Sequence, residues 1–278
     1  MYVRFDQGLG RGAESGKAYS STPRTMIGPL SYIGGKRTLA KRVIALFPEH
    51  TTYVEAFAGG AQVFFHKEPS KVEVLNDLDG EIVNFFRVCQ LHHEELLRYF
   101  RFTLISRKSF DLLKATDPAT LTDIQRAARY LYLLKSSFAS LIRHPNYHWH
   151  VVQPPGFNLE HLPQLIDNAH KRLARVQIEC RPYEEVLKCY DRPTTLFYLD
   201  PPYFGLKLYR YNFNAEDFEK LAERLGTLHG KFVLSLNDLP EVRTIFCKFH
   251  VKHVETAYTA QKKAGRRFGE VFITNFAP

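Results

Sequence analysis

The spacing of apolar residues divides the chain into segments with strand-like and helix-like periodicity. From residue 27 to 91, and again from 172 to the C-terminus, short β-rich runs alternate with stretches whose apolar residues recur every three or four positions. This alternation predicts a mostly parallel sheet covered by helices on both faces. The expected strands are 52–57, 72–75, 176–180, 195–199, 231–236, 250–256 and 270–276, and the expected helices are 37–47, 61–66, 81–91, 183–190, 215–228 and 240–246.

A different pattern occupies the middle of the chain. Residues 92–171 keep helical spacing, interrupted only by a loop rich in His, Tyr, Trp and Pro. We therefore expect one α/β domain, formed by 27–91 and 172–278, that is interrupted by a helical insertion at 92–171. Residues 1–26 are rich in Gly, Ser and charge, so we expect a flexible N-terminal tail and no secretory signal.

Composition favours a polyanionic partner. The 38 Lys and Arg residues exceed the 29 Asp and Glu residues, which gives a formal charge of +9, and a basic surface binds nucleic acid by displacing condensed counterions. No run approaches the roughly 18 apolar residues that a membrane span needs. The twelve histidines lack zinc-ligand spacing, so no metal is expected. The four cysteines are far apart and are expected to be reduced core residues: Cys89, Cys180, Cys189 and Cys247.

Three segments that follow predicted strands carry candidate chemistry, because α/β sheets bind ligands beyond the carboxyl ends of their strands. The segment from Glu55 to Ala61 combines small residues with a glycine turn, which either lets backbone amides approach a ligand or forms an ordinary tight turn. Asp77 ends the next strand, where an acid either binds ribose hydroxyls or caps the following helix.

The third segment, Leu199-Asp200-Pro201-Pro202-Tyr203, is the most specific. Consecutive prolines fix the backbone and remove two N–H donors, so a carboxylate, a free carbonyl and an aromatic ring are held in one rigid loop. An exocyclic amino group has two N–H donors, one for the Asp200 carboxylate and one for the Pro201 carbonyl, and its ring can stack on Tyr203. The tetrad therefore indicates methylation of an amino group.

Together with Tyr32-Ile33-Gly34-Gly35-Lys36 and the segment from Glu55 to Ala61, the tetrad resembles the Dam-type (D12 class) DNA adenine-N6 methyltransferases in motif order and context. The resemblance runs from residue 27 to the C-terminus. It implies an α/β, Rossmann-like, S-adenosylmethionine-dependent methyltransferase domain with a helical target-recognition insertion. It also implies transfer of a methyl group from S-adenosylmethionine to N6 of a flipped-out adenine in double-stranded DNA.

The resemblance assigns roles to residues by their position. Glu55, Phe57 and Gly59 are expected around the methionine end of the cofactor, Asp77 at its ribose and Tyr183 at its adenine ring. Taken alone, Lys36 could also belong to the solvated face of a helix. The implied catalytic residues are Lys36, Asp200, Pro201, Pro202 and Tyr203, and the implied cofactor-binding residues are Tyr32, Gly34, Gly35, Lys36, Glu55, Phe57, Gly59, Asp77, Tyr183 and Asp200.

The insertion is expected to grip the DNA. Residues 136–143 resemble the base-reading stretch of the family, with Phe138 as an intercalating wedge and Leu141 and Arg143 as readers of base edges. Ala139 and the loop after it differ from GATC-specific members, so a relaxed or altered recognition site is implied, as in some prophage-type members. A later loop contains four basic residues and no acid, and it either contacts phosphates or is simply solvated: Lys262, Lys263, Arg266 and Arg267.

Two alternatives differ from this prediction in substrate or in class. A cytosine-N4 methyltransferase uses a similar tetrad, more often headed by Ser, and a non-catalytic DNA-binding protein could retain the same scaffold. Asp200 and the Gly-Gly-Lys segment favour adenine, and the intact Lys36, Asp77 and Tyr203 argue against loss of catalysis. We expect a cytoplasmic enzyme, bacterial or phage-encoded, of the kind found in restriction-modification systems. The oligomeric state does not follow from the sequence.

Overall fold

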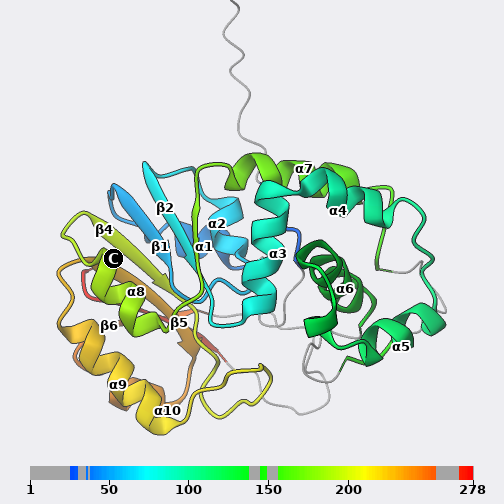
Figure 1. The fold of residues 1–278 in the computed structure, drawn as a ribbon. Helices are drawn as coiled ribbons and strands as arrows, with labels where there is room; N and C mark the ends of the chain where they lie inside the picture. The colour runs from blue at the N-terminus through cyan, green and yellow to red at the C-terminus, as the bar shows by residue number, and fades with distance from the viewer. Residues whose placement is uncertain are drawn as a thin grey trace, which may run out of the picture.

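The computed structural model describes residues 26–30, 36, 38–137, 145–148, 156–254 and 269–277. Within this part of the chain, seven strands form one sheet with the order β3-β2-β1-β4-β5-β7-β6. Every pairing is parallel except the two made by β7, which runs antiparallel to β5 and β6. The predicted mostly parallel sheet is therefore confirmed (Figure 1).

The order of the strands brings several strand ends to one place. The chain runs outward from β1 through β2 to β3 and then returns to β4 on the other side of β1, so the direction of progression reverses between β1 and β4. Ligands of α/β sheets bind at such switch points. The strands are β1 Thr52–Glu55, β2 Val72–Asn76, β3 Gln177–Glu179, β4 Thr195–Leu199, β5 Lys231–Asn237, β6 His250–Val254 and β7 Glu270–Thr274.

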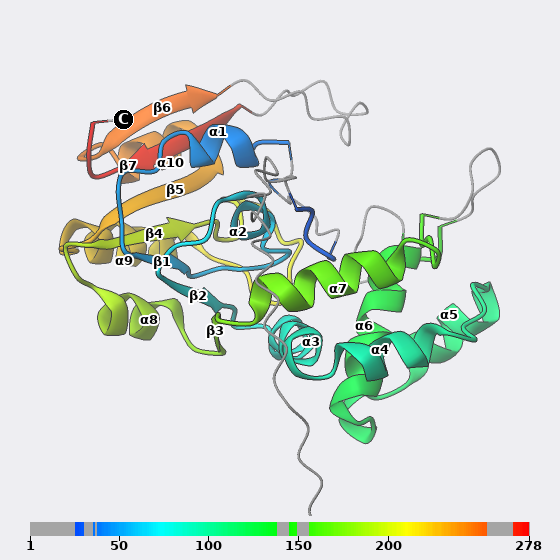
Figure 2. The ribbon, with the colours of Figure 1, turned by 90° about the horizontal axis from the view of Figure 1, so that it is seen from above.

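Helices cover both faces of the sheet, and each face has its own apolar core (Figure 2). Neighbouring strand residues point to opposite faces, so Phe197 of β4 joins one core and Tyr198 the other. Because both faces are covered, all of β4 is buried, and its sequence is an almost continuous apolar run. Helices α1 Ala40–Ile44, α2 Gln62–His66 and α3 Gly80–Leu91 lie on one face, and α8 Tyr183–Tyr190, α9 Ala215–Gly226 and α10 Pro240–Ile245 lie on the other.

A group of helices lies beside the sheet and packs against α3 (Figures 1 and 2). It consists of α4 His93–Phe100, α5 Arg107–Ala115, the short 3-10 helix η1 Pro118–Thr120, α6 Asp123–Ser136 and α7 Leu162–Leu173. A reciprocal capping box between Thr122 and Gln125 starts α6. The helical character of this region agrees with the sequence pattern, while the insertion boundaries at 92 and 171 stay a prediction.

Some element ends differ from the predicted ones. The helix expected at 37–47 is observed as Ala40–Ile44, since Leu46 and Phe47 donate to carbonyls three residues back and the chain tightens ahead of Pro48. The strand expected at 52–57 ends at Glu55, and its last predicted residues line a cavity instead. Among the helices of the described residues, none combines the length and the apolar character that a membrane crossing demands.

The prediction that all four cysteines are core residues is wrong for three of them. Cys89 is buried in α3, but Cys180, Cys189 and Cys247 are exposed. Cys180 follows the edge strand β3, Cys189 belongs to the outward face of α8, and Cys247 follows the short α10. All four are free thiols. Helix or strand periodicity placed them correctly in or beside elements, but it did not show which face each thiol occupies.

Candidate active site

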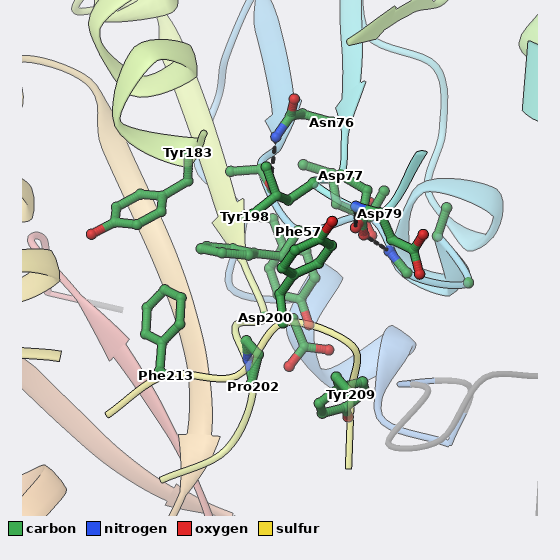
Figure 3. A pocket seen from close by; sticks show the side chains of 18 of the residues that line it. Phe57, Asn76, Asp77, Asp79, Tyr183, Tyr198, Asp200, Pro202, Tyr209 and Phe213 are labelled. Atoms are coloured by element: carbon green, nitrogen blue, oxygen red, sulfur yellow. Dashed lines mark hydrogen bonds between the residues drawn. The ribbon is translucent and has the colours of Figure 1, made fainter. Parts of the chain in front are cut away.

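A cavity of about 530 Å³ lies at the carboxyl ends of β1, β2 and β4 (Figure 3). Segments that follow these strands form its walls, together with Lys36, the start of α8 and the stretch from Tyr209 to Phe213. The predicted site residues that line it are Lys36, Glu55, Phe57, Gly59, Asp77, Tyr183, Asp200 and Pro202. Of the other tetrad members, Pro201 is buried outside the lining, and Tyr203 contacts Lys36.

A left-handed turn shapes the first wall. Gly59 and Ala61 have φ values of 48° and 49°, a conformation that costs a residue with a Cβ atom roughly 1–2 kcal/mol. The turn directs the N–H of Gly59 to Oδ2 of Asp77, at 2.8 Å. The glycine turn is therefore coupled to the acid at the end of the neighbouring strand.

Asp77 does not cap the next helix. Asp79 does so, by accepting a hydrogen bond from the N–H of Glu81, while Asp77 accepts from the N–H groups of Gly59 and Asp79. Burial raises the pKa of Asp77 to about 6. The capping alternative for Asp77 is thus wrong, and its carboxyl group lies in the cavity wall (Figure 3).

Asn76 joins three walls of the cavity. Its Nδ2 donates to the carbonyls of Ala56 and Arg181 at 2.9 and 3.0 Å, and its Oδ1 accepts from the N–H of Arg181. The loops after β1 and β3 are therefore held to the end of β2. The sequence interpretation gave Asn76 no role, although a polar residue at the end of a mostly apolar strand can indicate a side chain that holds neighbouring loops.

Three aromatic rings form another wall. The ring of Phe57 lies 5.3 Å from that of Tyr183 and 5.7 Å from that of Phe213, and Tyr183 and Phe213 are 5.7 Å apart. Figure 3 shows Tyr183 and Phe213 on one side of the cavity and Asp77 and Asp79 on the other. Sequence interpretation missed Phe213, whose signal is the aromatic segment Tyr209-Arg210-Tyr211-Asn212-Phe213 between the tetrad and α9.

Glu55 is a buried acid in the same cavity. Its Oε2 accepts from the hydroxyl of Tyr53 at 2.8 Å and from the N–H of Phe64 at 3.2 Å. Burial raises the pKa of Glu55 to about 8, and the nearby charge of Asp200 adds to the effect. A cationic group in the cavity would stabilise its ionised form.

Lys36 is the centre of a charged cluster and is not part of a solvated helix face, since it is only 3% exposed. Its Nζ donates to Oδ1 of Asp200 at 2.7 Å and to the hydroxyl of Tyr203 at 2.6 Å, and lies 3.1 Å from Oε1 of Glu270. Burial by itself lowers the pKa of Lys36, but attraction by Asp200, Tyr203 and Glu270 outweighs burial and holds the pKa well above its usual value. The ammonium group is therefore charged and firmly placed.

Asp200 is held but not saturated. Burial raises its pKa to about 6, against the opposing effect of Lys36 and with a further contribution from Glu270. Within the described ranges, Lys36 donates its hydrogen bond to Oδ1 of Asp200, which leaves Oδ2 to accept another. The carboxyl group borders the cavity (Figure 3). The arrangement can accept a hydrogen bond from an amino group that enters the cavity.

Several predicted site residues lie outside the described residues, and their roles stay predictions. In the part of the chain that the structure does describe, no group of three or more His, Cys, Asp or Glu side chains could hold a metal ion. The residues outside it are Tyr32, Gly34, Gly35, Phe138, Leu141, Arg143, Lys262, Lys263, Arg266 and Arg267.

A seven-stranded, mostly parallel sheet with a cavity at its switch point is the architecture of S-adenosylmethionine-dependent methyltransferases. The sequence model of the family described as "D12 class N6 adenine-specific DNA methyltransferase" matches residues 32–260, and the chain belongs to this family. Membership supports adenine-N6 methylation of DNA with S-adenosylmethionine, and it does not support the cytosine-N4 alternative.

Individual relatives agree with the family. The type II methyltransferase M1.LlaDCHI of Lactococcus lactis subsp. cremoris is 26% identical over 275 residues, which cover 88% of this chain and 94% of that protein. A DNA adenine methylase of Vibrio cholerae serotype O1 is 24% identical, with 90% of this chain and 95% of the relative covered. The DNA N-6-adenine-methyltransferase of Escherichia phage P1 is 22% identical over 77% of this chain, but over only 30% of its own length.

Proposed function

We propose that this protein methylates N6 of an adenine that has left the stack of double-stranded DNA, at a specific or relaxed set of sites. The observation that carries the proposal is the Asp200 carboxyl group, fixed by Lys36 in the wall of a cavity that also contains Glu55 and Asp77. An amino group within a duplex cannot reach this wall. The adenine must therefore flip out, at an unstacking cost of a few kcal/mol.

The cavity suits S-adenosylmethionine. The buried Glu55 offers a carboxylate to the ammonium group of the methionine end, and Asp77 offers acceptor oxygens to ribose hydroxyls. Tyr183 and Phe213 offer ring faces to the adenine of the cofactor. When bound, the cofactor supplies an activated methyl group on a sulfonium centre.

Replacing Phe213 with Ala is expected to weaken binding of S-adenosylmethionine by about 5- to 150-fold, because stacking on one aromatic ring is worth roughly 1–3 kcal/mol. Isothermal titration calorimetry without DNA measures the effect. Phe213→Tyr, which keeps the ring, should bind almost normally, and so should Phe102→Ala, since Phe102 is 88% exposed and does not line the cavity. Unchanged binding by Phe213→Ala would remove this ring from the proposed cofactor site.

The tetrad residues act on the target base. Asp200 accepts one hydrogen bond from the adenine amino group, the Pro201 carbonyl accepts the other, and Tyr203 stacks on the ring. These bonds return electron density to N6 and aim its lone pair. As N6 gains the methyl group from the sulfonium sulfur, it loses one proton, which Asp200 accepts. Because the bond forms directly between N6 and the methyl carbon, positioning of the two supplies much of the rate.

The rate of methyl transfer should fall as the pH drops through about 6. Ionised Asp200 is a stronger acceptor for the amino group than the protonated acid and can also take its proton, and burial raises its pKa to about 6. The active form is therefore complete above this pH and is lost below it. Single-turnover rates between pH 5 and pH 8.5, at saturating cofactor and DNA, measure the effect. A rate that stays constant down to pH 5 would contradict the assigned role.

We also propose that the residues of 136–143 and the basic loop around Lys262 contact DNA, and that 92–171 is the target-recognition insertion. The net charge of +9 and the family membership support this assignment. Arg143 is suited to donate to O6 and N7 of guanine, and Phe138 to fill the gap left by the flipped base.

The substrate is tested directly by incubating the protein with labelled S-adenosylmethionine and duplex DNA and by identifying the methylated nucleoside after digestion. We expect the label in N6-methyl-2′-deoxyadenosine. Label in N4-methylcytosine, or no label in DNA, would overturn the proposal. Sequencing of the methylated positions then separates a specific site from a relaxed one.

A further inference from the structure

Two buried polar residues, one beside Lys36 and one bonded to the residue after the tetrad, have no role in the proposed mechanism. Asn237 at the end of β5 pairs with Glu270 at the start of β7, in antiparallel register. They are 4% and 2% exposed, respectively. Glu270 also lies beyond residues 32–260, the range of the family match, and neither residue was singled out by its sequence context.

Glu270 is a carboxylate that depends on Lys36. Its Oε1 lies 3.1 Å from Nζ of Lys36, and among the described residues neither of its side-chain oxygens accepts a hydrogen bond. A buried charge without hydrogen bonds is costly unless an opposite charge faces it. The same ammonium group donates to Asp200 and Tyr203. Lys36 therefore lies between the buried carboxylate of Glu270 and the partly buried carboxylate of Asp200.

This sharing has a consequence for Asp200. A lysine paired with Asp200 alone would neutralise that carboxylate and weaken it as an acceptor, whereas a lysine shared with Glu270 leaves Asp200 more basic. The negative charge of Glu270 also raises the pKa of Asp200 directly, by repulsion. The charged groups that face Asp200 in the described residues are Lys36, Glu270 and Glu55.

Asn237 holds the backbone on the other side of the tetrad. Its Oδ1 accepts from the N–H of Phe204 at 3.1 Å, and its Nδ2 donates to the Phe204 carbonyl at 3.1 Å. Phe204 directly follows Tyr203, so the side-chain amide of Asn237 holds both the N–H and the carbonyl of the residue next to the tetrad. The loop cannot shift away from Asp200 without breaking both bonds.

We infer that Glu270 and Asn237 are positioning residues for methyl transfer: Glu270 sets the place and charge of Lys36, and Asn237 fixes the end of the tetrad loop. This inference rests on the proposed function of the tetrad. It predicts that the pair governs the chemical step more than the binding of either substrate. The antiparallel β7 therefore contributes to the site through its first residue.

The variant Glu270→Gln removes the charge and keeps the shape. We expect the single-turnover rate at pH 6.5 to fall at least about tenfold, while the Kd for S-adenosylmethionine and the KM for DNA stay within about twofold. The acidic limb of the pH–rate profile should move to lower pH, because the negative charge that raises the pKa of Asp200 is gone. Glu270→Asp, which keeps the charge, should leave that limb in place. Glu219→Gln, on the exposed face of α9, is the matched control.

A readout without turnover separates this inference from the proposed function. Carbon-13 titration of the side-chain carboxyl signals in the cofactor-free protein, with Asp200 assigned through Asp200→Asn, should show a lower pKa for Asp200 in Glu270→Gln. That result stands even if wild-type protein methylates another base. An unchanged Asp200 titration, in a variant that is fully folded by circular dichroism, would overturn the role of Glu270.

Asn237 is tested by Asn237→Ala and by the double variant with Glu270→Gln. We expect a rate loss of at least about tenfold for Asn237→Ala, and a double-variant loss smaller than the product of the two, because both residues act on the tetrad, Glu270 through Lys36 and Asn237 through Phe204. A rate equal to that of the wild type, or fully independent effects, would contradict a shared positioning role. Thermal unfolding of each variant identifies any loss that is due to misfolding.

Discussion

Replacement of Asp200 with Ala is expected to slow methyl transfer by roughly a thousandfold or more, while retention of DNA changes little. The substitution removes a partner of Lys36 and, in the proposed mechanism, the acceptor for the target amino group and for its proton. Because Asp200 lies in the cavity wall and carries negative charge, it adds nothing to the attraction of phosphates. Single-turnover rates and electrophoretic mobility shifts measure the two effects separately.

Two controls sharpen this experiment. Asp111→Ala removes a carboxylate that is 57% exposed on α5 and that pairs, among the described residues, with Arg107 at the surface, so its rate should equal that of the wild type. Asp200→Asn keeps the shape and an acceptor oxygen but loses the charge, so its rate should lie between those of the wild type and Asp200→Ala. A fully active Asp200→Ala would exclude Asp200 from the reaction.

The sequence predicted those parts of the fold and site that are local. The rigid Asp-Pro-Pro-Tyr loop and the glycine turn are each built from neighbouring residues, so composition and order were enough to place Asp200 and Gly59 at the ends of strands. The aromatic Tyr183 and the acid Asp77 were found in the same way, by their places relative to predicted strands. The structure brings all four into the lining of one cavity.

The parts that escaped prediction depend on long-range pairing. Glu270 reaches Lys36 only because β7 enters the sheet antiparallel between β5 and β6, and the alternating pattern of strands and helices carries no sign of that strand order. Asn237 and Asn76 act through side-chain amides on backbone of other segments, and such contacts have no periodicity. Buried polar residues at strand ends are the signal that could have identified all three.

Replacement of Lys36 with Met is expected to lower the free energy of unfolding by about 3–5 kcal/mol at pH 8, because it leaves the buried Glu270 and the partly buried Asp200 without their opposite charge. The loss should be smaller at pH 5. Burial already raises the pKa of Asp200 to about 6, and loss of the opposing Lys36 charge raises it further above the unfolded value of about 4, so the folded variant binds more protons than the unfolded chain. The stability that this protonation supplies is complete at low pH and disappears as the pH rises through the folded-state pKa values.

Urea unfolding at pH 5 and pH 8 tests the Lys36 prediction, with Lys41→Met as the control because Lys41 is exposed on α1. We expect the control to match the wild type at both values of pH. Equal losses for Lys36→Met at pH 5 and pH 8 would mean that the side chain stabilises by packing and not by charge. A loss confined to high pH would instead show that the ammonium group of Lys36 stabilises the fold by opposing the negative charge of the neighbouring carboxylates. The acceptor that the proposed mechanism assigns to Asp200 would then depend on Lys36 and Glu270 as well as on the tetrad.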